Sequence, residues 1–128
     1  MLSNDVIYRE ACILLGCNES VEVSILIVEL PLNLRLNILK KIVGLTPNRN
    51  NGRHNRRIQR HLSQLATSIY INTKRWKDRW RVPDEFKKII DSLPQKKALY
   101  KMQSRILKIL RRAYFLANDH VINNPAGR

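Results

Sequence analysis

Arginine and lysine side chains gather in dense clusters in this chain, and phosphate binding is the chemistry that they suit. One cluster begins at Arg56 and another begins at Lys74, while Arg49 and Arg53 lie in a stretch rich in asparagine. Guanidinium and ammonium groups donate charge-assisted hydrogen bonds to phosphate oxygens. The candidate nucleic-acid-binding residues are therefore Arg49, Arg53, Arg56, Arg57, Arg60, Lys74, Arg75, Lys77, Arg79 and Arg81.

A single long helix over residues 56–80 is predicted to carry the two main clusters at its two ends. Its apolar residues recur at helical spacing, and they are Ile58, Leu62, Leu65, Ala66, Ile69, Trp76 and Trp80. Cations near the helix start oppose the helix dipole by roughly 0.3 to 1 kcal/mol each, so a bound anion there would offset a cost. The alternative is a solvated charged face. The two tryptophans are predicted to be core, with stacking on single-stranded bases as the alternative.

The charge is divided unevenly along the 128 residues, whose formal net charge is +14. Residues 1–48 hold four basic and five acidic side chains, a net of −1, whereas the rest of the chain holds twenty and five, a net of +15. Such an excess repels itself unless an anionic ligand is near, and nucleic acid is the usual ligand. The charge therefore predicts nucleic-acid binding by the second part of the chain.

The composition predicts an all-α fold, because glycines and prolines are few and lie mainly between stretches with helical periodicity. Helices are expected over residues 5–15, 21–29, 31–43, 56–80, 84–93 and 95–118. Asn18 or Ser20 can cap the second helix, which is apolar almost all round, and Gly44 can stop the third. Phe115 and Leu116 belong to the expected apolar side of the last helix, whose other side is a second cationic strip.

Four regions follow from these patterns. They are a near-neutral helical assembly region with a helix-turn-helix-like pair over 1–46, a basic linker over 47–55, a basic helical region over 56–122 and a flexible tail over 123–128. The assembly region has its own candidate core residues, which are Leu15, Leu30, Leu32, Leu36, Leu39 and Val43.

The run from Leu15 to Val43 also resembles a known family. Leu15-Gly16-x-Asn18-Glu19, followed after ten residues by Leu30-Pro31 and an apolar, basic helix, is similar to the D-type subunit of the flagellar master transcriptional regulator and its relatives on conjugative elements. The resemblance implies a helical transcription activator that works as a homo- or hetero-oligomer with a C-type partner subunit, which would carry the structural zinc. The strong positive charge after Pro47 departs from the family, and it suggests that this chain touches nucleic acid itself.

Several other classes are not indicated. No phosphate-binding glycine loop, nucleophile motif or zinc-ligand spacing is present, so we expect neither an enzyme nor a cofactor. Cys12 and Cys17 are expected to be core or interface thiols. No apolar run approaches the twenty residues of a membrane span, so we expect a cytoplasmic protein without membrane contact.

The leading hypothesis is a DNA-binding transcriptional regulator. The positive charge is also compatible with two alternatives: an RNA-binding or ribosome-associated protein, and an interaction module for an acidic protein.

Overall fold

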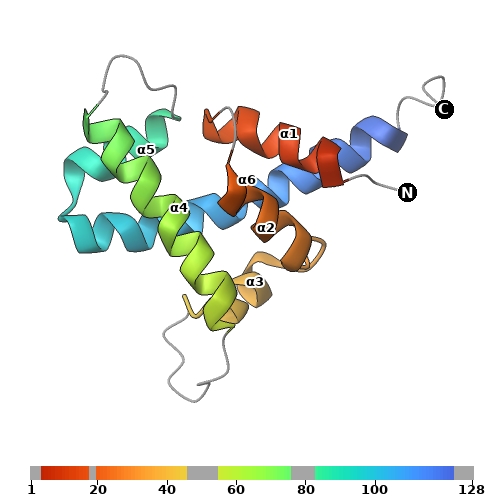
Figure 1. Ribbon diagram of the computed structural model, residues 1–128, viewed down its shortest axis with the longest axis horizontal. Helices are drawn as coiled ribbons and strands as arrows, with labels where there is room; N and C mark the ends of the chain where they lie inside the picture. The colour runs from red at the N-terminus through yellow and green to blue at the C-terminus, as the bar shows by residue number, and fades with distance from the viewer. Residues whose placement is uncertain (1–3, 18–19, 46–54, 76–82, 123–128) are drawn as a thin grey trace.

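The computed structural model describes residues 4–17, 20–45, 55–75 and 83–122, and within these ranges the chain is entirely helical (Figure 1). The helices are α1 (Asn4–Leu15), α2 (Val21–Glu29), α3 (Leu36–Ile42), α4 (Arg56–Arg75), α5 (Asp84–Ser92) and α6 (Gln95–Ile122). The prediction of an all-α fold is confirmed. No described helix combines the length and apolar character that crossing a membrane requires.

Helix α6 is the element on which the others are assembled. Its 28 residues extend about 42 Å at 1.5 Å per residue. Helices α1, α3, α4 and α5 all pack on it, and α2 packs between α1 and α4 (Figure 1). Leu26, Leu62 and Met102 are all 0% exposed within one hydrophobic cluster. The near-neutral and basic parts of the sequence therefore share one core.

Local signals fix several helix ends where the sequence predicts them. The Ser20 hydroxyl accepts a hydrogen bond from the Val23 amide at 3.2 Å, which confirms Ser20 as the N-cap of α2. Gly44 has φ 75°, and its amide and that of Leu45 bond to the carbonyls of Lys41 and Lys40. This 6→1 and 5→2 pattern satisfies the last carbonyls of α3 and needs a residue that tolerates positive φ.

Two predicted helix boundaries are wrong. The third helix does not begin at Pro31: the Leu34 amide bonds to the Pro31 carbonyl in a turn, and α3 begins only at Leu36. Pro31 is compatible with a first helical turn, but it fits a turn equally well. The last helix continues past Asn118 to Ile122, because asparagine weakens a helix without ending it.

The burial of the apolar residues agrees only partly with the expected faces. Five of the candidate core residues of the assembly region are buried, namely Leu15, Leu30, Leu32, Leu39 and Val43, and Leu36 is half-buried. Helix α2 is not buried all round, since Val21 is 70% and Val28 63% exposed. The reason is that α1 and α4 cover only part of its circumference. Phe115 and Leu116 on α6 are also exposed, contrary to expectation.

Candidate nucleic-acid interface

A polar cleft lies between the first turns of α4 and the neighbouring part of α6. It encloses about 290 Å³ and is lined by Arg56, Gln59, Arg60, Ser63, Gln64 and Gln103. We call these six residues the arginine–glutamine cleft.

The start of α4 is held by its cap. The Asn55 side-chain oxygen accepts from the Ile58 amide at 3.1 Å, and the Asn55 amide donates to the Ile42 carbonyl at 2.7 Å. The first bond satisfies one of the free amides of the helix start, and the second ties that start to the end of α3. Because Ile58 and Leu62 face the core, Arg56 and Arg60 are directed to the surface.

The arginine–glutamine cleft presents hydrogen-bonding groups without a carboxylate. Arg56 and Arg60 are exposed, one helical turn apart, and no carboxylate of the described residues lies within ion-pair distance of either. Guanidinium groups suit phosphate oxygens, and glutamine amides can both donate to and accept from base edges. The cleft therefore combines the two kinds of group found at protein–DNA contacts.

Arg57 has a different role from its neighbours. Its Nη1 lies 2.7 Å from Oε1 of Glu29, and the two side chains are 63% and 24% exposed. The ion pair joins α4 to the end of α2. A pair this exposed contributes at most about 1 kcal/mol to stability. Arg57, which was predicted to contact phosphate, is nevertheless paired with a carboxylate of the same chain.

The first two residues of the second predicted cluster, Lys74 and Arg75, lie at the other end of α4. Lys74 is 18 residues from Arg56 along one helix, which corresponds to about 27 Å. Its Nζ lies 5.1 Å from the centre of the Tyr70 ring, and Arg75 beside it is exposed. The structure thus separates Lys74 and Arg75 from the arginines at the start of α4. Arg49, Arg53, Lys77, Arg79 and Arg81 lie outside the described residues, as do Trp76 and Trp80.

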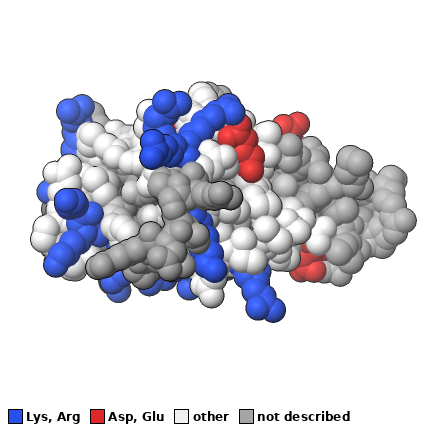
Figure 2. All heavy atoms as spheres, turned by 90° about the horizontal axis from the view of Figure 1, so that it is seen from below, with Lys and Arg blue, Asp and Glu red and all other residues white. Residues whose placement is uncertain are grey.

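Further exposed cations follow α6. Lys97, Lys101, Lys108 and Arg112 are all exposed, and their spacing places them on one side of the helix. On the face in Figure 2, Lys and Arg side chains lie mainly in the left and central parts, whereas the few visible Asp and Glu side chains lie from the centre toward the right. Exposed cations of the described residues therefore occur along α6 as well as at the arginine–glutamine cleft.

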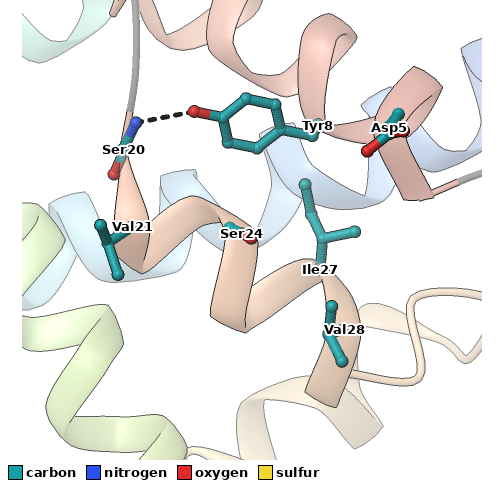
Figure 3. A pocket seen from close by; sticks show the side chains of 7 residues that line it. All are labelled: Asp5, Tyr8, Ser20, Val21, Ser24, Ile27 and Val28. Atoms are coloured by element: carbon teal, nitrogen blue, oxygen red, sulfur yellow. Dashed lines mark hydrogen bonds between the residues drawn. The ribbon is translucent and has the colours of Figure 1, made fainter.

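A second hollow lies between α1 and α2, away from the arginines. It encloses about 470 Å³ and is lined by Asp5, Tyr8, Ser20, Val21, Ser24, Ile27 and Val28. Figure 3 shows Tyr8 reaching from α1 to the start of α2, where its hydroxyl oxygen accepts from the Ser20 amide at 2.9 Å. We call this hollow the α1–α2 groove. Its exposed valines form an uncovered apolar edge.

The two cysteines lie at the end of α1 and just after it, where the chain leads toward α2. Both are free, with Cys12 buried and Cys17 half-buried. Burial, reinforced by the neighbouring Cys12, raises the pKa of Cys17 from 9.0 to about 12. A thiol with so high a pKa has little thiolate at neutral pH and is a poor nucleophile. No group of three or more potential metal ligands occurs among the described residues.

Comparison with known protein families, curated proteins and solved structures gives no match.

Proposed function

We propose that this protein is a DNA-binding transcriptional regulator, an activator subunit that works as a complex with a C-type partner subunit. The observation that carries the proposal is the arginine–glutamine cleft, in which two guanidinium groups and three amides converge without a carboxylate. Phosphate contacts supply most of the affinity of such proteins, and amide contacts to base edges supply sequence preference.

The surrounding charge supports the same proposal. The net charge of +15 from Arg49 onward attracts DNA at long range. The exposed cations of α6 extend this field along the molecule, so a duplex held at the cleft is also held by its flanking phosphates. Affinity and association rate then both fall as salt screens the field.

The proposed partner subunit binds at the α1–α2 groove. This part of the proposal rests on the resemblance of residues 15–43 to the D-type subunit and on Val21 and Val28 of α2, which line the groove and are exposed. Exposed apolar side chains close to a groove are typical of protein interfaces. The proposal thus gives DNA and the partner separate surfaces.

The pair α2 and α3 is the helix-turn-helix-like element of the proposal. Helix α3 has seven residues, or about 10 Å of helix, and its exposed side chains include Asn37 and Lys41. A helix this short can present one turn to a major groove, so we assign it a secondary role beside the arginine–glutamine cleft.

The test is binding to duplex DNA measured by fluorescence anisotropy at several salt concentrations. Fragments from upstream of the protein's own operon are compared with random sequence, with and without a coexpressed partner. We expect about five or more phosphate contacts, which correspond to a log–log salt slope of about −4.5 or steeper. A slope shallower than roughly −2 would refute the proposal.

Sequence preference is the second readout. Failure to distinguish operon fragments from random sequence, with or without the partner, would also refute the regulator. Retention of a defined RNA after nuclease treatment, with indifference to promoter DNA, would support an RNA-binding function instead. A protein complex that persists after all nucleic acid is removed would support an interaction module.

A further inference from the structure

A third surface hollow lies where α5 turns into α6, and the proposed function does not use its apolar lining. It encloses about 500 Å³ and is lined by Leu93, Lys96, Lys97, Tyr100 and Lys101. Apolar atoms make up nearly all of its lining, so the lysines contribute mainly their methylene chains. We call it the Tyr100 pocket.

Tyr100 is both exposed and fixed in place. It is 52% exposed, although its hydroxyl donates a hydrogen bond to the carbonyl of Leu45 at the end of α3. A tyrosine whose polar end is already bonded to its own chain presents mainly its aromatic ring to solvent. The ring therefore needs little ordering when a flat partner stacks on it.

Three cations surround this ring, with no counter-charge among the residues that the structure describes. Lys96, Lys97 and Lys101 are exposed, and no described carboxylate lies within ion-pair distance of any of them. An apolar pocket with an aromatic wall and an ammonium rim is complementary to a flat, weakly polar ring attached to an anionic backbone. An unpaired nucleobase with its flanking phosphates has this chemistry.

We propose that the Tyr100 pocket receives one unpaired nucleobase, which stacks on Tyr100 while Lys96, Lys97 and Lys101 contact the phosphates on either side. The inference rests on the proposed DNA binding and adds a preference for nucleic acid that contains an extruded base. One feature favours nucleic acid over an acidic protein. Lys96 lies seven residues from Gln103 on the same helix, about 10 Å along its axis, and this spacing places the two residues on nearly the same side of α6. The pocket therefore lies near the arginine–glutamine cleft, on nearly the same side of α6.

The lining of the Tyr100 pocket also indicates which property of a nucleobase the pocket recognises. Because polar atoms are nearly absent from its lining, the pocket has few groups that could hydrogen-bond to a base edge. Stacking on an aromatic ring tolerates every base. We therefore expect discrimination between paired and unpaired bases and little discrimination among the four bases.

The experiment compares two duplexes of identical random sequence. One carries 2-aminopurine in a single-nucleotide bulge, and the other is fully paired. The wild-type protein should bind the bulged duplex about 5-fold to 150-fold more tightly, which is the range for stacking one base on an aromatic side chain. The fluorescence of 2-aminopurine should fall on binding, since stacking quenches it.

Three variants identify the ring as the cause. Tyr100→Phe keeps the ring and should keep the preference for the bulge, whereas Tyr100→Leu should lose it and still bind the paired duplex. The matched control is Phe115→Leu, an exposed ring 15 residues further along α6 that already has the Arg111 guanidinium 4.8 Å from its centre. This control should behave as wild type.

Failure of the inference and failure of the proposed function are distinguishable. Equal affinity for both duplexes, with no change in Tyr100→Leu, would overturn the Tyr100 pocket and leave DNA binding intact. No binding to either duplex would overturn the proposed function and the inference together. Binding of a glutamate-rich peptide that depends on Tyr100, without any preference for the bulge, would assign the pocket to an acidic protein and overturn the inference.

Discussion

Replacing Arg56 and Arg60 together with glutamine removes both charges of the arginine–glutamine cleft and leaves the fold unchanged. Both side chains are exposed, and neither pairs with a carboxylate among the described residues. The buried Ile58 and Leu62 beside them are untouched. Arg57 is kept, because its pair with Glu29 links α4 to α2.

The expected loss follows from the number of phosphate contacts. Each lost contact lowers the log–log salt slope by about 0.9, so the double variant should have a slope shallower by about 1.8. If wild type and double variant bind equally at 1 M salt, this difference in slope makes the affinity of the variant about 60-fold lower at 0.1 M salt, or roughly 2.4 kcal/mol weaker. The free energy of unfolding should change by no more than about 0.5 kcal/mol, as is typical of surface substitutions.

The assay is anisotropy on one duplex across a salt series, with a second double variant as the control. Lys74→Gln with Arg75→Gln makes the same charge change on the same helix, about 27 Å away and beyond the Debye length of about 10 Å at 0.1 M salt. We expect its slope to change less. Equal slopes for the two double variants would show that net charge alone drives binding and that the arginine–glutamine cleft has no special part.

The remaining predictions concern the fold. Leu39→Asp should unfold or precipitate the protein, because burying an unpaired carboxylate costs several kcal/mol against a total stability of about 5 to 15 kcal/mol. Leu36→Asp should destabilise the protein less, because Leu36 is only half-buried. A Leu39→Asp variant that melts like wild type would show that the helical register is wrong. Ser20→Ala should cost about 1 kcal/mol in urea unfolding, the usual value of an N-cap, and an unchanged midpoint would contradict the cap. Because the folded-state pKa of Cys17 is raised from 9.0 to about 12, the unfolded chain loses this proton first as the pH rises, so the free energy of unfolding should fall between these values. The free energy of unfolding should fall by at most about 1.4 kcal/mol per pH unit, and by less because solvent surrounds the half-buried thiol. Cys17→Ala should lack this part of the pH dependence. Identical pH dependence in the wild type and in Cys17→Ala would refute the raised pKa.

Features set by neighbouring residues in the sequence were predictable. The cap at Ser20 and the stop at Gly44 each follow from one residue and the few beside it, and the structure shows both. The start of α3 was not predictable in this way, because Pro31 is compatible with a turn as well as a helix start. Intrinsic preference alone does not decide between the two.

Features set by contacts between distant segments were not predictable. Gln103 joins the arginine–glutamine cleft only because α6 packs beside the start of α4, and nothing in its own sequence neighbourhood indicates this. Arg57 and Arg56 are adjacent and chemically identical, yet one pairs with Glu29 and the other lines the cleft. The helical phase of these residues relative to α2 decides their roles, and that phase depends on the tertiary packing.

The packing of α1 along α6 has a consequence for how the protein folds while it is being synthesised. The apolar face of α1, with Ile7, Ala11 and Leu15, is buried in the same core cluster as α6, but α6 begins 80 positions after the end of α1. At a synthesis rate of 5 to 20 residues per second, about 4 to 16 s pass between the synthesis of the end of α1 and that of the start of α6. During that interval the nascent chain exposes an apolar helix, so slow translation through the intervening segment would increase its exposure to chaperones and to aggregation.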